Sequence, residues 1–438
     1  MRPILILALL LVPLSASAAP PVSPDGNMER KAIPAPYKWK LAPILKSDKA
    51  FEAGLKQAAA MRQKIEGYKG KLNKGENLQG CLMLYFKARL LTNKLTLYAN
   101  MRKDTANKAP RFKEMVQRSL ASMNDLMSVA SFIRQEVLAL DKAAMDRAYK
   151  AAPKLQAYRA YIDGLRRRRS RVLGPEAERV LSLAGDNLWA EIDLNEIPSE
   201  HEKTFGELIT GLALPTIKDE QGKEVQLTLA NYGKFRASKD RRVRRDTVEG
   251  LFKSLRATQG PLASTLAGQA AFSVFLARSR GYDTALEAYL DKDNIDPEVY
   301  RNLIRSIRAN LAPLHRYVRF RKKAMGLKKV RIYDLYAPMV KKVKMQFPYA
   351  KALKVLPAAL APLGPDYIKV LKRGMKPGSG WMDLYPGKDK NSGAFSASVY
   401  GVHPYVKMNY FDGVDDLSTL AHEFGHALHS FLSMKAQP

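Results

Sequence analysis

Cysteine is almost absent from this sequence, since Cys81 is the only one among 438 residues. A single thiol cannot close an internal disulfide, so covalent stapling is excluded as a source of stability. Cys81 lies in the apolar stretch 78–84. We therefore expect Cys81 to be a buried core residue.

Acidic side chains are also scarce: 42 Asp and Glu stand against 73 Lys and Arg, a formal net charge of +31. Such a field favours anionic partners, whether acidic peptides, nucleic acid or a membrane surface. The basic residues are spread along the chain, and the densest run, 166–171, has no interleaved aromatic residues. This run predicts a solvated helical face, with an anion-binding patch as the alternative. The absence of any zinc-finger, homeodomain or RNP pattern argues against nucleic acid as a partner.

Long apolar runs are missing beyond the N-terminus, so no membrane span is expected there. The N-terminus itself has Arg2, an apolar run at 4–14 and the small residues A-S-A at 16–18. That order is typical of a secretory signal peptide over 1–18. A buried or membrane-anchored N-terminal helix is the alternative. No cysteine follows the signal, so we expect no lipid anchor and predict an exported, periplasmic or secreted protein.

Hydrophobic periodicity predicts a mainly α fold. Ser47 has the position of a helix N-cap, and apolar residues then recur at steps of three and four. Two short segments around Gly222 predict a β-hairpin instead. The predicted helices after the first one are 78–101, 112–138, 144–165, 176–183, 240–255, 262–279 and 297–324, and the predicted hairpin strands are 216–218 and 225–227.

The length allows two or three domains with a sizeable core. Proline-rich, polar composition marks 19–46 as a linker or irregular arm. We predict a helical N-terminal domain at 47–205. The change of character near residue 215 then predicts a second domain at 206–438, with a small β-sheet among its helices.

Residues 402–410 follow a loop-rich region at 374–398 and have a different pattern. Apolar and polar side chains alternate with a period of two, which predicts a half-buried strand. Pro404 cannot donate a hydrogen bond to a neighbouring strand, so we expect an edge strand. Such an edge could hold an extended peptide by β-augmentation, with His403 and Tyr405 among the residues that contact it.

The most informative segment is H-E-F-G-H, residues 422–426. His422 and His426 are one helical turn apart, so both imidazoles leave the same face and can bind one Zn²⁺ ion. Glu423 can accept a proton from a zinc-polarised water and deliver it to the leaving amine of a peptide. Asp416 is the expected N-cap, and the expected buried stripe consists of Leu417, Leu420, Phe424, Leu428 and Phe431. The alternative is a partly buried helix with hydrogen-bonded histidines.

The remaining histidines have weaker claims to a role. His429 is seven residues from His422, about 10.5 Å along the axis, so one zinc ion cannot readily bind both. We expect a structural or supporting role for His429. His403 either faces the substrate or stays on the polar side of its strand. His201 and His315 are far from other candidate ligands in the sequence and receive no role.

The segment H-E-F-G-H-A-L-H-S at 422–430 resembles the active-site helix of the oligoendopeptidase F and thimet oligopeptidase group of zinc metallopeptidases. Further agreement lies in Y-D-L-Y-A-P at 333–338, S-G-A-F-S at 392–396 and H-P-Y-V at 403–406. The resemblance covers roughly 75–438. It implies a helical zincin-type fold for oligopeptide substrates, and it makes 206–438 the catalytic domain.

The resemblance also implies one zinc ion on His422 and His426, with Glu423 as general base and acid. In the family a glutamate on a later helix is the third ligand, and tyrosine and histidine residues that follow stabilise the reaction intermediate. None of these can be assigned within 1–438. We therefore expect the chain to be incomplete at its C-terminus and poorly active as it stands. We also expect the apolar stripe of the 422–426 helix to lack part of its covering.

Three functions remain open from the sequence. The leading one is a zinc metalloendopeptidase of oligopeptides. The second is a catalytically inactive, truncated remnant that still binds peptides. The third is a basic envelope or nucleic-acid-binding protein in which H-E-x-x-H is incidental.

The signal-peptide pattern generates a prediction about location. We expect signal cleavage after Ala18, so that the mature chain begins at Ala19 outside the cytoplasm. N-terminal sequencing of the abundant species in the native host measures this directly. Retention of residues 1–18 on that species would contradict it.

Overall fold

The computed structural model describes residues 22–26, 28–174, 176–177, 181, 200–339, 345–391 and 393–436. The chain divides into two compact units, 1–157 together with 345–438, and 158–344. The predicted signal peptide lies outside the described residues, as does most of the helix predicted at 176–183. The predicted domain limit at 205 and 206 is not a boundary between these units, and it stays a prediction.

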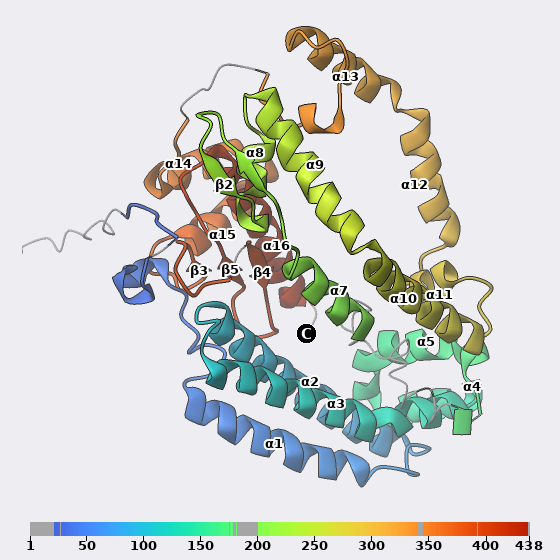
Figure 1. Ribbon diagram of the computed structural model, residues 1–438. Coiled ribbons are helices and arrows are strands. Elements are labelled where there is room, and N and C mark those ends of the chain that lie inside the picture. Colours follow the sequence, from blue (N-terminus) through green and yellow to red (C-terminus); the bar gives the residue numbers. More distant parts are fainter. Residues whose placement is uncertain are drawn as a thin grey trace, which may run out of the picture. The chain divides into compact units, whose positions relative to one another are not determined.

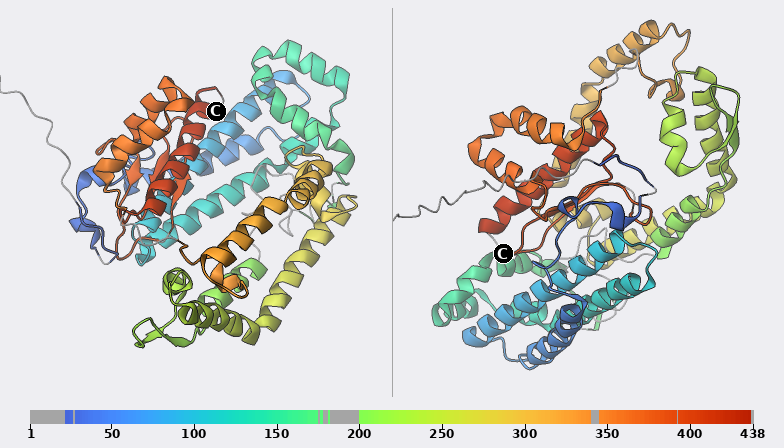
Figure 2. Two further views of the ribbon diagram at one scale, coloured as in Figure 1. Left: turned by 90° about the horizontal axis from the view of Figure 1, so that it is seen from above. Right: turned by 90° about the vertical axis from the view of Figure 1, so that its left-hand side faces the viewer.

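Three long helices pack side by side in the first unit: α1 (Asp48–Glu66), α2 (Gly75–Asp104) and α3 (Pro110–Ala139) (Figures 1 and 2). Ser47 caps α1 as predicted, since its Oγ accepts a hydrogen bond from the Ala50 N–H at 3.2 Å. Gly54 allows α1 to approach α2, because a Cβ there would lie 2.7 Å from Leu95 Cδ2. Cys81 is fully buried in α2, and burial raises the pKa of its thiol to about 12. The predicted buried cysteine is confirmed.

Two predicted helices are each broken into two. The segment 144–165 becomes α4 (Lys142–Ala151) and α5 (Arg159–Arg167), with a 3₁₀ turn at Pro153–Tyr158 between them. The segment 297–324 becomes α12 (Pro297–Ala309) and α13 (Ala312–Ala324). Pro153 and Pro313 explain the breaks, because proline lacks the N–H that a continuous helix needs and clashes with the preceding turn.

The predicted linker or arm at 19–46 is an ordered arm where it is described. It forms short 3₁₀ turns at Arg30–Ala32 and Ala35–Tyr37. Ile33 and Tyr37 are buried in the same core as α16 (Val414–Ala436), the helix that contains H-E-F-G-H. Trp39 belongs to the core of α1 and α2. The backbone N–H of Leu384 donates to the Tyr37 carbonyl at 3.0 Å, which anchors the arm to the C-terminal part of the unit.

The C-terminal part of the first unit contains a three-stranded sheet with the order β3-β5-β4. β3 (Met382–Asp383) pairs with β5 (Tyr405–Lys407) in parallel, and β4 (Phe395–Ala397) pairs with β5 antiparallel. β5 is therefore the central strand, and the prediction of an edge strand at 402–410 is wrong. Pro404 precedes β5 and costs it no hydrogen bond. The expected polar face is wrong as well, because every residue of β5 is buried.

Helices α14 (Tyr349–Ala359), α15 (Pro365–Met375) and α16 (Val414–Ala436) share one apolar core with this sheet. Leu420, Phe424 and Leu428 of α16 are fully buried, and Leu417 and Phe431 pack partly buried against the same core. The predicted stripe is confirmed. The sheet, α14 and α15 cover the middle of the stripe, whereas Leu417 and Phe431 keep part of their surface exposed, so the expected gap in the covering concerns only the two ends of the stripe.

The second unit is also helical. It comprises α5, α7 (Glu200–Thr210), α8 (Leu229–Arg236), α9 (Arg241–Ala257), α10 (Gln259–Ser279), α11 (Ala285–Asp291), α12 and α13, and the hairpin β1 (Thr216–Lys218) and β2 (Glu224–Gln226). The predicted hairpin and its turn at Gly222, with φ of +83°, are confirmed. Asp296 caps α12, accepting a hydrogen bond from the Glu298 N–H at 2.8 Å. One helix of the described part, α10, has the length and composition of a possible membrane span, which the sequence analysis did not expect; a single such helix is weak support.

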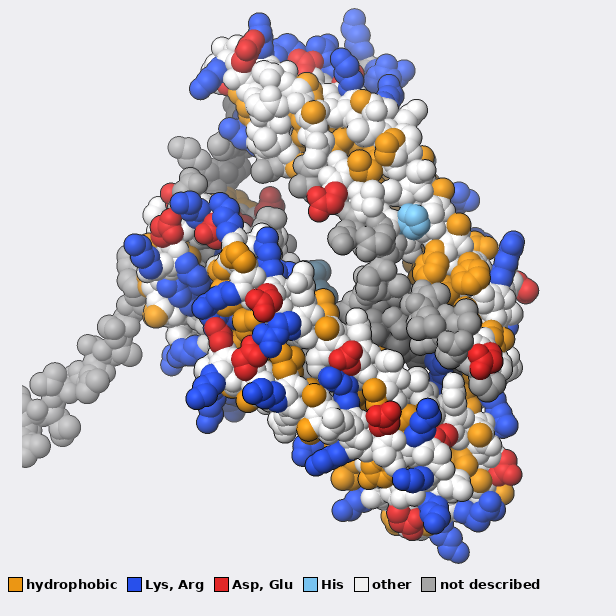
Figure 3. All heavy atoms as spheres, turned by 60° about the horizontal axis from the view of Figure 1, so that its bottom comes forward, with side chains coloured by type: hydrophobic (Ala, Val, Ile, Leu, Met, Phe, Trp, Pro, Cys, Tyr) orange, Lys and Arg blue, Asp and Glu red, His pale blue; other side chains and the backbone are white. Residues whose placement is uncertain are grey.

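The arginine run at 166–171 is a solvated face in part, since Arg167, Arg169 and Ser170 are exposed, and the anion-binding alternative stays a prediction. Arg167 and Arg168 both pair with Asp291, and they also donate to main-chain carbonyls at the end of α11. Arg171 lies 4.1 Å from the centroid of the Tyr282 ring. Other basic side chains are dispersed among acidic ones on the face shown in Figure 3. Part of the positive charge of this run is therefore neutralised within the second unit.

Asp383 of β3 is almost completely buried and holds the arm against the sheet. It accepts hydrogen bonds from Arg30 Nη1 at 3.1 Å and Nη2 at 2.6 Å, and it pairs with the buried Lys390 Nζ at 2.8 Å. Burial alone would raise the pKa of Asp383, but Lys390 and Arg30 hold that pKa below its usual value. The ion pairs of Asp383 with Arg30 and Lys390 thus join the arm, β3 and the loop before β4.

We predict that Asp383→Asn lowers the free energy of unfolding at pH 7 by about 3–5 kcal/mol, because Lys390 is left buried without its counter-charge. The pKa of Asp383 is depressed in the fold, so its contribution is complete above the unfolded pKa of about 3.9 and is lost as the pH falls through the lower folded value. Urea unfolding at pH 7, and again at a pH below the folded pKa of Asp383, measures the effect. The control is Glu298→Gln on exposed α12; equal unfolding midpoints for all three proteins at pH 7 would contradict the prediction.

Candidate active site

Helix α16 begins at Val414, so Asp416 lies in its first turn and is not the N-cap that the sequence predicted. Asp416 Oδ2 instead accepts hydrogen bonds from the N–H groups of Phe411 at 3.1 Å and Gly413 at 2.9 Å. These bonds satisfy donors that a helix start would otherwise leave unpaired. Asp416, in the first turn, therefore stabilises the start of α16.

The motif residues divide between the two sides of α16. Leu420, Phe424 and Leu428 face the core, whereas His422 and His426 are exposed. The two Nε2 atoms lie 3.1 Å apart, and the ring planes are at 83°. Two imidazole nitrogens at 2.0–2.1 Å from one tetrahedral Zn²⁺ ion would lie about 3.3 Å apart. The pair therefore fits a shared metal ion with a shift of a few tenths of an ångström.

Glu423 is the buried member of the motif, with 7% of its surface exposed. Among the residues that the structure describes, none donates a hydrogen bond to its carboxylate or forms an ion pair with it. The carboxylate therefore keeps its hydrogen-bonding capacity for another group. Its position between the two histidines in the sequence makes it the candidate proton acceptor.

A third metal ligand is not found. The described part of the chain contains no cluster of three or more His, Cys, Asp or Glu side chains that could hold a metal ion. His429 is exposed, so the structure gives it no packing role. It has no described contact with His422 or His426.

His403 and Tyr405 are brought together by packing. The His403 ring stacks on Trp381, with centroids 5.2 Å apart and planes at 4°, and its Nδ1 lies 2.9 Å from the Pro404 carbonyl oxygen. Burial lowers the pKa of His403. The Tyr405 side chain is fully buried, and its hydroxyl donates to the Lys40 carbonyl at 3.0 Å. Neither position supports the predicted contact with substrate, and for Tyr405 the burial argues against it.

β4 is one of the two edge strands of the sheet, and the sequence did not predict it. The N–H groups of Val406 and Met408 donate toward β3, so Tyr405 and Lys407 direct their peptide groups toward β4. Ser396 lies opposite Val406, and its N–H and C=O therefore point away from β5. β4 lies against α16. Three residues are too few for a period-two signal, although Gly393 marks the preceding turn.

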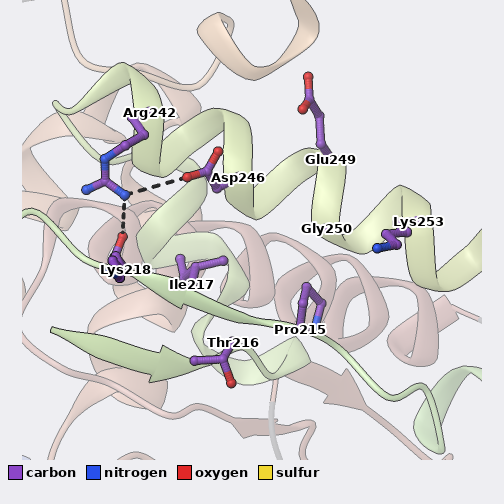
Figure 4. Close-up of a pocket in the computed structure, with 9 residues that line it drawn as sticks. All are labelled: Pro215, Thr216, Ile217, Lys218, Arg242, Asp246, Glu249, Gly250 and Lys253. Carbon is purple, nitrogen blue, oxygen red and sulfur yellow. Dashed lines mark hydrogen bonds and ion pairs between the residues drawn. The ribbon is translucent and has the colours of Figure 1, made fainter. Parts of the chain in front are cut away.

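A second concave surface lies in the other unit. A shallow groove of about 450 Å³ runs between the β1–β2 hairpin and α9, and Figure 4 shows Glu249 and Lys253 on its helical side. Its remaining lining residues are Pro215, Thr216, Ile217, Lys218, Arg242, Asp246 and Gly250. It has no histidine and none of the motif residues. We therefore place the candidate chemistry on α16.

Comparison with known proteins decides the family. Residues 235–438 match peptidase family M3, and residues 136–188 match oligopeptidase F. This C-terminal region belongs to peptidase family M3. The first match includes the whole of α16 with His422, Glu423 and His426, so the motif lies inside the family's own region of the chain.

Individual M3 relatives are similar over nearly the whole chain. Oligopeptidase PepF of Bacillus subtilis is 32% identical over 94% of this chain and 60% of its own length. Group B oligopeptidase PepB of Streptococcus agalactiae is 28% identical over 93% of this chain and 66% of its own length. The crystal structure of oligoendopeptidase-F from Enterococcus faecium has a TM-score of 0.62 at 27% identity, covering 75% of this chain and 60% of that one. The chain thus spans about 60% to two thirds of its relatives' length.

Proposed function

We propose that this M3 protein takes part in zinc-dependent hydrolysis of oligopeptides, with His422 and His426 as metal ligands and Glu423 as general base and acid. The observation that carries the proposal is the pair of exposed imidazoles with Nε2 atoms 3.1 Å apart, next in the sequence to Glu423, whose carboxylate has no partner among the described residues. The names of the M3 relatives, oligopeptidases and oligoendopeptidases, support the substrate class.

Each motif residue has a separate task in this proposal. His422 and His426 bind through neutral Nε2 atoms, and the burial of the opposite side of α16 keeps their spacing constant. When bound, zinc would polarise the attacking water and the peptide carbonyl. Glu423 accepts the proton of that water and passes it to the leaving amine. Its low exposure keeps bulk water from competing for the same carboxylate.

A peptide-binding protein without turnover is the second candidate, and one observation favours it. The described residues supply two histidine ligands, whereas catalytic zinc sites usually have three protein ligands. The third alternative, a basic envelope or nucleic-acid-binding protein, is weakened only locally, because two arginines of the densest run, Arg167 and Arg168, pair with Asp291 inside their own unit. Export stays a prediction, to be tested by the N-terminal sequence.

The first test separates metal binding from chemistry. We predict that His422→Ala and His426→Ala abolish zinc binding, while Glu423→Gln and the control His429→Ala retain it. In any form that cleaves a quenched fluorescent peptide, Glu423→Gln should reduce turnover by about 10²–10⁴-fold, the usual contribution of a general base. Metal analysis after dialysis and a cleavage assay measure the two effects.

For the chain of 438 residues we expect weak zinc binding and little turnover, since a third ligand is not found. Tight stoichiometric zinc with ordinary turnover would mean that the chain supplies this ligand itself, and His403 would be the first residue to replace. Unchanged cleavage by Glu423→Gln would refute the assigned mechanism.

We further propose that an extended peptide pairs with the open edge of β4, which replaces β5 in the original prediction. Ser396 would offer its outward N–H and C=O to the peptide backbone, beside α16. β4 is half-buried, so both its edge and the helix remain reachable from solvent.

We predict that Ser396→Pro weakens peptide binding about two- to tenfold, because one backbone hydrogen bond is lost while the β4–β5 pairing remains. Fluorescence anisotropy with a labelled peptide, in a Glu423→Gln background that prevents cleavage, measures the affinity. The matched control is Ala397→Pro. The N–H of Ala397 points toward β5, so losing this hydrogen-bond donor should lower the melting temperature. Equal peptide affinity for Ser396→Pro and the parent would exclude pairing at β4.

A further inference from the structure

Helix α12 is the most exposed apolar element of the described chain. None of its residues is buried, and every residue after Pro297 is exposed. Five large apolar side chains, with exposures from 40% to 63%, lie within about 140° of the helix circumference. We call this surface the α12 face; it consists of Val299, Tyr300, Leu303, Ile304 and Ile307.

An open face of this kind is unfavourable for a helix of 13 residues. Helices of that length are marginal in water, and in proteins they are stabilised mainly by packing of the apolar side. Within its own unit α12 contacts chiefly α11, at one end (Figure 1). The α12 face therefore has the character of a surface made to be covered.

The charges beside the face restrict what covers it. Residues 297–324 of α12 and α13 contain one acidic residue, Glu298. Their eight basic residues are Arg301, Arg305, Arg308, Arg316, Arg319, Arg321, Lys322 and Lys323. Arg321 is buried, and Arg301 and Arg305 pair with Glu298. The exposed surface of the two helices stays net positive, so a symmetric contact with a second copy would bring like charges together, which is unfavourable. A covering segment with acidic residues beside its own apolar stripe would be complementary.

The lengths of the relatives indicate where such a segment exists. The matches cover 93% and 94% of this chain but only 60% and 66% of the relatives, which therefore contain additional polypeptide. We propose that the α12 face is the binding surface for an amphipathic segment with acidic flanks, of the kind supplied by the region of the relatives that lies outside the match. This interface needs neither zinc nor peptide cleavage, so it stands apart from the proposed function.

Hydrogen exchange on two intact proteins tests the proposal. In this chain alone, the amides of α12 should exchange rapidly, because no described residue buries the helix. In the intact B. subtilis relative, the amides of the helix aligned with α12 should exchange at least about 100-fold more slowly, because its apolar side is buried. Rapid exchange in both proteins, or slow exchange in both, would overturn the proposal.

Substitutions on the α12 face provide a second test of the proposal. Leu303→Asp with Ile307→Asp should leave the melting temperature of this chain nearly unchanged, as should the control Leu120→Asp on α3, whose side chain is 47% exposed. The aligned double substitution should lower the melting temperature of the longer relative by several degrees. A relative that tolerates it as this chain does would overturn the proposal.

The other possible occupants have their own signatures. Vesicles containing phosphatidylglycerol that slow exchange in α12, with loss of this effect in Leu303→Asp, would assign the face to a lipid surface. Exchange that slows with rising protein concentration would assign it to a second copy. Either result would overturn the proposal.

Discussion

The burial of one side of α16 is the constraint on which the candidate site depends. Leu420, Phe424 and Leu428 are fully buried among the sheet, α14 and α15, so the helix cannot rotate without exposing them. Because the helical period is 3.6 residues, the same orientation places His422 and His426 on the exposed side. Gly374 allows this packing, since a Cβ there would lie 2.8 Å from both Phe424 and Trp381.

Buried charge connects segments that are far apart in the sequence. Asp383 joins the N-terminal arm to β3, and in the other unit the buried Asp334 accepts from Arg241 at 3.0 Å and Arg244 at 2.9 Å. Burial alone would raise the pKa of Asp334, but the bonds from Arg241, the Arg331 N–H and Arg244 lower it. Burying these charges carries a desolvation penalty, which offsets much of their contribution to stability. Their main effect is therefore to determine which segments pack together.

The two surfaces of interest differ in what they lack. The helix α16 has an apolar core beneath it, but only two candidate metal ligands are found on it among the described residues. The α12 face is exposed along its length among the described residues. Both differences concern groups that a longer M3 polypeptide could supply, which is why the relatives' additional length bears on chemistry and on packing alike.

The sequence by itself determined the local features, because they depend on residues a few positions apart. The cap at Ser47, the hairpin turn at Gly222, the stripe of α16 and the spacing of His422 and His426 were all predictable in this way. Tertiary structure decided the rest. Which strand is central depends on hydrogen bonds from β3 and β4 to β5, and these strands are too short to show a pattern of their own. The partners of the arginine run are more than 100 residues away, and no local pattern specifies a contact over that distance.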